Sequence, residues 1–207
     1  MYKRQLTSRE LHAAIGDGSI AELVHWRPVA KGDVIFVPAG TIHAIGAGIV
    51  LAEIQQHSDT TFRLFDYGRP RALHADEAVA VADAQPAPAQ SGPRRLTAMR
   101  TALVASPHFV LERVVLPANS HWALDAKRET WILVIEGDAR IGAINASAGD
   151  VVFAEADRAG IEAGPAGMSG LIAYPGPAPV MSLLVESKMT PADGRSPNSK
   201  KIAEVQS

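Results

Sequence analysis

A single histidine in a run of strand-forming and turn-forming residues is the first feature of this chain that could do chemistry. His43 lies within the stretch GDVIFVPAGTIHAIGAG, residues 32–48. Pro38 fixes φ and Gly40 permits a positive φ, so a sharp reversal is expected just before the imidazole. Because the chain contains no cysteine, any metal ion must be held by His, Asp, Glu or Gln side chains. His43 is therefore a candidate metal ligand, and a hydrogen-bonded structural role is the alternative.

Polar side chains on the expected strand after His43 could line the same site. Residues 49–56 are rich in strand-forming residues, and period-two alternation places Glu53, Gln55 and His57 on one face of a strand. The opposite face is apolar, and a polar row on such a strand can border a wet cavity. The alternative is that Glu53 and Gln55 simply face solvent.

One arginine on the next expected strand, residues 61–67, could project into that space. A guanidinium binds oxyanions through a rigid fork of donors, which makes Arg63 a candidate for anion binding. The alternative is a surface ion pair between Arg63 and Asp59 or Asp66. Two further arginines are expected to be solvated: Arg69 and Arg71.

The bulk composition predicts a folded globular chain without a nucleic-acid or membrane partner. The 207 residues are 47% hydrophobic, and the net charge of -2 gives no basic footprint for nucleic acid. No window reaches the ~18 apolar residues that a membrane span needs, and the N-terminal residues lack the apolar core of a secretory signal. We therefore expect a cytoplasmic protein.

Short helices are expected before the strands. Thr7 and Glu10 have the spacing of a capping box, and Ser19 and Glu22 repeat it. Three helices are predicted: residues 7 to about 15, a second one between residue 19 and Pro28, and residues 75–83.

Short strands separated by turn-forming residues dominate the rest of the chain and favour a mainly β protein. The strands are expected at residues 34–37, 49–56, 61–67, 108–116, 130–137, 139–144, 149–157, 169–174 and 179–186. The expected domains are 1–83, a Pro- and Ala-rich linker at 84–95, a second β-domain at 96–187 and a disordered tail at 188–207. The sequences GDVIFVPAG at 32 and GDVVFAEAD at 149 are alike, which predicts two copies of one β-fold.

Two motifs carry a resemblance to known families. Gly32, Pro38, Gly40 and His43 have the spacing G-x5-P-x-G-x2-H, which resembles the second conserved motif of the cupins, a jelly-roll family. The cupin motif usually ends in Asn where this chain has Ala47. The stretch QHSDTTFR, within a similarity that is dense from about residue 6 to 83, resembles the C-terminal part of the catalytic core of type I mannose-6-phosphate isomerases, also called phosphomannose isomerases. The resemblance implies two cupin-like jelly-roll β-barrels, with short helices at the N-terminus and before the linker.

The resemblance also implies a zinc-dependent interconversion of mannose 6-phosphate and fructose 6-phosphate through a cis-enediol. In the family one zinc per site is held by a Gln and a His in one short motif, by a Glu, and by a second His that matches His43. Arg63 matches the active-site arginine. We therefore take Glu53 and Arg63 as catalytic candidates and Gln55 and Arg63 as substrate-binding candidates, while His57 replaces an Asn of the family and is given no role.

The other zinc ligands lie upstream in the family, so the chain is expected to be an N-terminally truncated isomerase that is inactive alone. Its second β-domain has Glu155 and Gly160 where the first has Pro38 and His43, which predicts a metal-free, structural domain. One alternative is a non-enzymatic sugar-phosphate-binding or interaction module made of degenerate cupins. Another is a rebuilt metal site of His43, His57 and Glu53. The expected partners are a small-molecule sugar phosphate and, through exposed strand edges, further copies of the chain.

Overall fold

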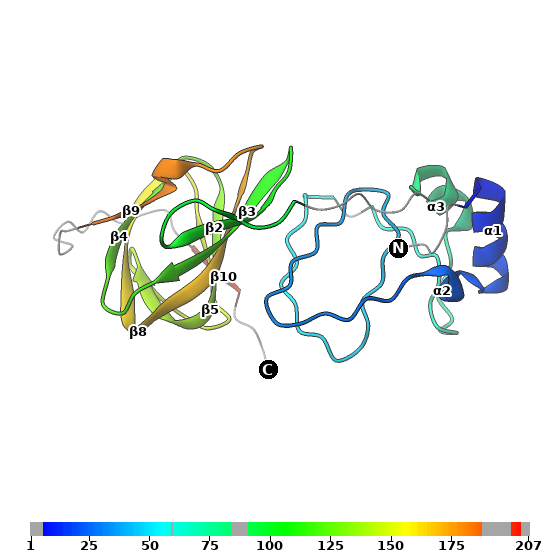
Figure 1. Cartoon of the computed structure of the whole chain (residues 1–207), viewed down its shortest axis with the longest axis horizontal. Coiled ribbons are helices and arrows are strands. Elements are labelled where there is room, and N and C mark those ends of the chain that lie inside the picture. Colours follow the sequence, from blue (N-terminus) through cyan, green and yellow to red (C-terminus); the bar gives the residue numbers. More distant parts are fainter. Residues whose placement is uncertain (1–5, 59, 84–90, 188–199, 204–207) are drawn as a thin grey trace. The chain divides into compact units, whose positions relative to one another are not determined.

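The computed structural model describes residues 6–58, 60–83, 91–187 and 200–203. The chain divides into two compact units, Met1–Gln90 and Ser91–Ser207, and the division falls within the linker predicted at residues 84–95 (Figure 1). Within the described residues every α-helix lies in the first unit and every strand in the second. The elements are α1 (Ser8–Asp17), α2 (Ile20–Leu23), α3 (Ala75–Val81), β1 (Arg94–Arg95), β2 (Arg100–Ala105), β3 (Phe109–Leu116), β4 (His121–Ala126), β5 (Thr130–Ile141), β6 (Ile144–Ser147), β7 (Val151–Ala154), β8 (Asp157–Pro175), the 3-10 helix η1 (Met181–Leu183), β9 (Leu184–Glu186) and β10 (Lys200–Ala203).

Helix α1 begins with the capping box that the sequence predicts. The Glu10 amide donates to Thr7 Oγ1 at 3.2 Å, and the Thr7 amide donates to Glu10 Oε2 at 2.8 Å. Each bond satisfies an amide that has no partner within the helix. Gly18 ends α1 in the left-handed region, with a φ of 80°. The prediction for this helix is confirmed, apart from an end two residues later than expected.

The second predicted capping box does not form. Helix α2 follows Ser19, but that residue has helical dihedrals, with φ -66° and ψ -11°, and its side chain makes no capping bond. An N-cap needs an extended backbone to aim its oxygen at the amide three residues on. The Ser19 amide instead donates to Asp17 Oδ1 at 2.9 Å. The helix ends at Leu23, well before Pro28.

A small apolar core joins the three helices of the first unit. Its buried members come from the start of the chain through α2, and half-buried apolar side chains from residues 42–82 pack against them. The buried residues are Leu6, Leu11, Ala14, Ile15 and Ile20. This core includes Leu6 and Leu11, which flank the N-cap Thr7 of α1.

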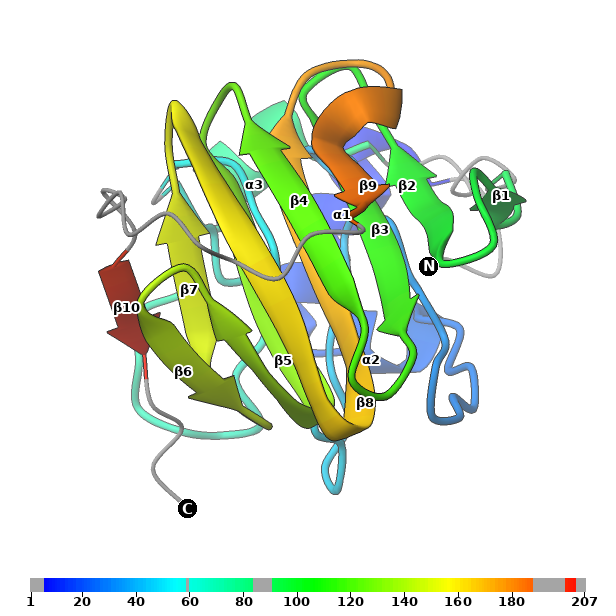
Figure 2. The ribbon, with the colours of Figure 1, turned by 90° about the vertical axis from the view of Figure 1, so that its left-hand side faces the viewer.

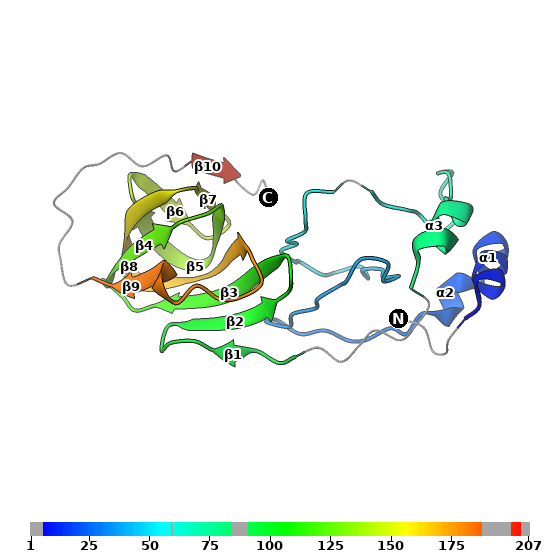
Figure 3. The same ribbon diagram turned by 90° about the horizontal axis from the view of Figure 1, so that it is seen from above.

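The three strands predicted in the first unit are wrong. Residues 34–37, 49–56 and 61–67 run as extended connections, and the structure assigns no strand among described residues 6–83 (Figure 3). One isolated bridge joins Thr41 and Asp83. A period-two pattern predicts an extended backbone, but a strand also requires a neighbour in register to hydrogen-bond with. The expected barrel is therefore not closed in this unit.

The second unit is one curled antiparallel sheet of ten strands (Figure 2). The strands follow the order β1-β2-β3-β8-β5-β7-β10, while β4 pairs with β8 and β9, and β6 pairs with β5. The long strand β8 carries the curl because its two halves pair with different neighbours, β4 first and β3 later. Within the segment predicted to be a disordered tail, β10 pairs with β7. The rest of that segment lies outside the described residues.

The predicted strands of the second unit are present with different bounds. Residues 130–137 and 139–144 were expected as two strands, but β5 runs through Gly137 to Ile141. The register shifts on both sides of this glycine. Gly137 has a φ of 76°, and a Cβ there would lie 2.0 Å from the Gly167 oxygen. Glycine therefore marks a bulge within the strand rather than its end. Strands β1, β2, β4 and β10 and most of β6 were not predicted, and the strand expected at residues 179–186 is η1 followed by β9.

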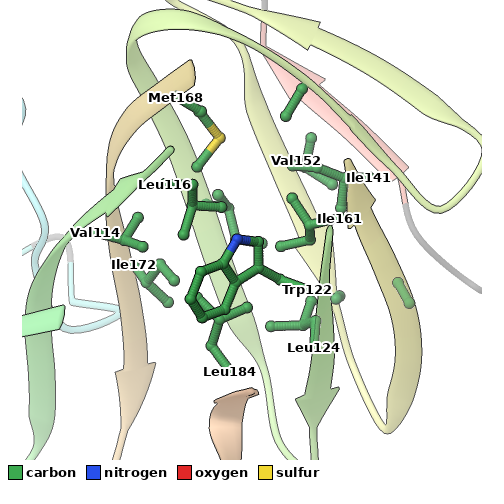
Figure 4. Close-up of a cluster of buried hydrophobic side chains, with 14 of the residues drawn as sticks. Val114, Leu116, Trp122, Leu124, Ile141, Val152, Ile161, Met168, Ile172 and Leu184 are labelled. Atoms are coloured by element: carbon green, nitrogen blue, oxygen red, sulfur yellow. The ribbon is translucent and has the colours of Figure 1, made fainter. Parts of the chain in front are cut away.

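Apolar side chains from all sides of the curled sheet meet in one core (Figure 4). Alternation places them there, as in β4, where Trp122, Leu124 and Ala126 are buried and the intervening residues are more exposed. Leu183 and Leu184 close the core from η1 and β9. The interior of the second unit is therefore packed with side chains.

A buried charged network fixes the segment that leads into η1. The guanidinium of Arg100 donates to both carboxylate oxygens of Glu112, at 2.7 and 2.9 Å, and to the carbonyls of Val180 and Met181, at 2.8 and 3.0 Å. Tyr174 donates to the same carboxylate. Burial and this bond raise the pKa of Tyr174 to about 12. The network joins β2, β3 and β8 to the chain that forms β9.

The sequence repeat encodes the same turn in both units. Gly32 and Gly149 both have a φ of 94°. The carboxylate of Asp33 accepts the amide of Ala30 at 3.1 Å, and that of Asp150 accepts the amide of Ser147 at 2.9 Å. After the turn, the second copy enters β7 and pairs with β5, whereas the first copy forms no strand. The repeat is thus confirmed at the turn and not in the strand.

The buried ion pair should dominate the stability of the second unit. Arg100→Met leaves Glu112 charged and buried without its partner, and we expect a loss of about 3–5 kcal/mol in the free energy of unfolding. Arg158→Met is the matched control, because Arg158 pairs with Asp125 with a side chain that is 83% exposed. That change should cost less than about 1 kcal/mol. Urea unfolding of both variants measures the difference, and equal losses would contradict this assignment.

Candidate functional site

The turn before His43 forms as the sequence predicts. The Thr41 amide donates to the Pro38 carbonyl at 3.1 Å, and Gly40 has a φ of 81°. The turn packs on the chain that leaves α3, where the Asp83 amide donates to the Gly40 carbonyl at 2.9 Å. A Cβ on Gly40 would lie 2.8 Å from the Val81 oxygen. Both the positive φ and this close approach require glycine.

His43 lies on the surface two residues after the turn. Its Nδ1 atom is 3.0 Å from the Thr41 carbonyl oxygen. A carbonyl can only accept, so Nδ1 carries the proton and Nε2 keeps its lone pair. An exposed Nε2 of this kind can bind a metal ion or a proton.

Glu53 and Gln55 are exposed, and no hydrogen bond among the described residues joins either of them to His43. The expected two-faced pattern is absent as well, because Val50 and Ala52 are exposed and only Ile54 is half-buried in this segment. Without a second layer against it, the apolar face of the segment has nothing to pack on. The expectation that this segment presents an apolar face to a core is wrong.

Arg63 is half-buried and is held by the segment that precedes α3. Its guanidinium Nη1 donates to the Ala72 carbonyl at 3.3 Å, and its backbone exchanges two hydrogen bonds with His74. No hydrogen bond or ion pair among the described residues joins His43, Glu53, Gln55 and Arg63 to one another.

Arg69 and Arg71 are exposed, as expected, and both also form ion pairs with Asp66. Arg71 forms a two-point contact with its carboxylate, with Nε 2.5 Å from Oδ2, and Arg69 Nη2 lies 3.0 Å from Oδ1. The Asp66 side chain is only 5% exposed. The hydrogen bond from Arg71 holds the pKa of Asp66 below its ordinary value of 3.8. The arginines thus order the turn after residues 61–67.

The described residues do not fit a complete zinc site. A catalytic zinc ion needs about three protein ligands, and no group of three or more His, Asp or Glu side chains with suitable geometry occurs among the described residues. A Gln-x-His spacing does occur at Gln55-Gln56-His57, which the expectation of upstream ligands overlooked. Both end residues are exposed. No zinc step can be built from these residues alone.

The second unit presents no counterpart of the candidate site. Glu155 and Gly160 stand where the first unit has Pro38 and His43, and both are exposed. His121, on β4, has a buried Nδ1 atom, and it is the one buried side-chain N or O atom without a hydrogen-bond partner in the described part of the chain.

Every helix among the described residues is too short or too polar to cross a bilayer.

Comparisons with known proteins give the class of the fold and then its relatives. No family profile matches the chain. A solved structure of mannose 6-phosphate isomerase from Bacillus subtilis has a TM-score of 0.62 at 19% sequence identity, and the match covers 82% of this chain and 57% of that one. The predicted mainly β, cupin-like fold class is thereby confirmed.

Sequence comparison identifies the relatives. Mannose-6-phosphate isomerase of Streptococcus mutans is 40% identical over 114 residues, which cover 51% of this chain and 36% of that protein. Mannose-6-phosphate isomerase ManA of Bacillus subtilis is 34% identical over 149 residues, which cover 65% of this chain and 45% of that protein. The chain is a homologue of proteins named mannose-6-phosphate isomerase, and it spans less than half of their length.

Gly40→Ala tests the turn that presents His43. Gly48→Ala is the matched control, because Gly48 also has a positive φ, 78°, but nothing lies within 4 Å of a Cβ there. Backbone strain of about 1–3 kcal/mol is common to both changes. Gly40→Ala should lower the unfolding temperature of the first unit further, since it adds a clash with the Val81 carbonyl. Circular dichroism melts of the two variants measure this, and identical melts would exclude the close contact.

The Asp66 cluster predicts a pH dependence. Because the folded pKa of Asp66 is lowered, the charged form contributes stability at all pH values above the unfolded pKa, and this contribution is lost as the pH falls below 3.8. Carboxyl NMR should give a midpoint for Asp66 below 3.8, and Arg71→Leu should raise it. Arg27→Leu, which removes an arginine outside this cluster, should leave it unchanged. A midpoint unaffected by Arg71→Leu would contradict this assignment.

Proposed function

We propose that this chain is part of an aldose-ketose isomerase that interconverts mannose 6-phosphate and fructose 6-phosphate. The observation that carries the proposal is the sequence identity of 40% and 34% to two curated proteins of that name. The shared fold of a solved isomerase supports it. The His43 turn and the held Arg63 both lie in the first unit, where the proposed site is located.

The proposed reaction moves a proton between C1 and C2 of the sugar through a cis-enediol. A base removes the proton from C2, the electron pair forms the C1–C2 double bond, and O1 takes up a proton. Loss of the proton from O2 and protonation of C1 then give the ketose. Glu53 is proposed to take part in the proton transfers, since a carboxylate can accept and return a proton. Arg63 is proposed to bind the enediolate or the phosphate, and Gln55 to bind a sugar hydroxyl.

We further propose that the site is completed by polypeptide outside this sequence. Three observations support this. His43 is a single imidazole where about three ligands are needed. The chain spans 36% to 45% of the length of its two relatives. Large apolar side chains of the first unit are exposed along its extended segments, among them Trp26, Ile35, Ile45, Ile49, Val50 and Leu51.

Further strands would pair with these segments in the way that β5 pairs with β7 in the second unit. The turn at residues 30–33 matches the turn at residues 147–150, and only the second leads into a paired strand. Added strands would cover the exposed apolar side chains and complete a barrel around His43. In their absence, self-association through the same segments is the expected outcome. The chain alone is then proposed to be inactive as an isomerase.

A second candidate function is a non-enzymatic sugar-phosphate-binding or interaction module. The observation that favours it is that His43, Glu53 and Gln55 are exposed, and that no hydrogen bond or ion pair among the described residues joins them to Arg63. Such a module would bind mannose 6-phosphate without converting it.

Zinc content and turnover test the proposal together. The purified chain, supplied with zinc, should contain far less than one ion per molecule by elemental analysis, because it offers too few ligands, and it should not convert mannose 6-phosphate. A hybrid is then made by joining the chain to the part of the Streptococcus mutans relative that it does not align with. The hybrid should bind zinc and turn over substrate.

Two variants of the hybrid assign the activity to this chain. His43→Ala should abolish turnover and lower the zinc content, whereas His25→Ala, which removes an exposed histidine outside the site, should leave both unchanged. Turnover by the chain alone would contradict the proposed incompleteness. A folded hybrid that binds mannose 6-phosphate without converting it would favour the binding module instead.

A further inference from the structure

The segment between Arg63 and α3 folds back so that residues 72–74 hold Arg63 at three points. The Arg63 amide donates to Nδ1 of the His74 ring at 3.0 Å, and the His74 amide donates to the Arg63 carbonyl at 2.9 Å. The guanidinium donates to the Ala72 carbonyl at 3.3 Å. His74 therefore binds both backbone groups of the residue that is proposed to bind substrate.

The direction of the hydrogen bond to the ring fixes the state of the imidazole. A backbone amide can only donate, so His74 Nδ1 must be unprotonated in this arrangement. Protonation would turn the acceptor into a donor that faces another donor, and the bond would be lost. The contact thus exists only with the neutral ring.

Several charged groups lie around the ring. The Arg63 guanidinium opposes a second positive charge, and so does the amino end of α3, which starts directly after His74. Asp76 and Glu77, in the first turn of α3, act in the other direction. From α1, Nε2 of His12 lies 2.9 Å from the carboxylate of Asp76, so the negative charge of Asp76 also acts on His12. On the remaining side the edge of the Phe62 ring meets the imidazole, with centroids 6.2 Å apart.

We propose that His74 is a positioning residue for Arg63 and that it acts only as the neutral imidazole. It holds the backbone of Arg63 at a fixed distance from the start of α3, while the Ala72 carbonyl orients the guanidinium. Loss of the ring acceptor releases the Arg63 amide from this support. The consequence for binding of the phosphate or the enediolate by Arg63 rests on the proposed function.

Two substitutions test the acceptor. His74→Asn keeps a side-chain oxygen that can accept the hydrogen bond from the Arg63 amide. His74→Leu removes the acceptor. His57→Asn is the matched control, because His57 is exposed and has no contact with Arg63 among the described residues.

The test is amide hydrogen exchange of the whole chain, read by NMR as protection relative to an unstructured peptide at the same pH. The Arg63 amide should be protected in the unsubstituted chain, in His57→Asn and in His74→Asn. His74→Leu should lower this protection about tenfold or more, because it removes the acceptor. The amides of Ala14 and Ile15 in α1 should stay protected throughout, which shows that the first unit remains folded.

The inference is overturned if the Arg63 amide is unprotected in the unsubstituted chain, or if His74→Leu keeps that protection with α1 folded. It is also overturned if His74→Asn loses the protection as His74→Leu does. This readout needs no turnover, so failure of the isomerase assay leaves it intact. If Arg63 behaves as expected and yet the isomerase hybrid is equally active with His74→Leu, then the positioning does not serve the proposed reaction.

Discussion

Hydrogen bonding between neighbouring extended segments is the constraint on which both units of this chain depend. In the second unit each described strand has at least one antiparallel partner, and the curled sheet encloses a packed apolar core. In the first unit the same kind of sequence forms extended connections, and its large apolar side chains stay exposed. The difference lies in the supply of partner strands, since the turn that leads into each set is the same.

The candidate site lies in the first unit, where the extended segments have no partner strands among the described residues. Its local parts are well defined: a glycine turn packed on the chain after α3, an imidazole whose tautomer is set by the Thr41 carbonyl, and an arginine held by residues 72–74. No hydrogen bond or ion pair among the described residues joins these parts, and no strand is assigned among residues 6–58 and 60–83. The proposed reaction rests on similarity to proteins named mannose-6-phosphate isomerase. The incomplete ligand set among the described residues is the reason we propose that the rest of the site lies outside this sequence.

Sequence reasoning succeeded where a local pattern determines a local structure. The capping box of Thr7, the turn at Gly40 and the positive φ shared by Gly32 and Gly149 all follow from residue type and spacing. It failed where the outcome depends on distant segments. Residues 49–56 alternate like a strand without pairing, and β5 continues through a glycine that was read as a break. The alternation of Trp122, Leu124 and Ala126 could have revealed β4.

The contacts of charged groups were also beyond local patterns. Arg69 and Arg71 converge on Asp66, and Arg100 reaches Glu112 on a neighbouring strand, in arrangements that only the fold creates.

The central claim is that the first unit needs strands from polypeptide outside this sequence. It is tested most directly by comparing amide exchange in the two copies of the repeated sequence. We predict that amides of residues 34–37 exchange almost as fast as in an unstructured peptide, while those of residues 151–154 are strongly protected. Equal protection of the two segments in the chain alone would show that the first unit builds its own sheet, and the account would be wrong.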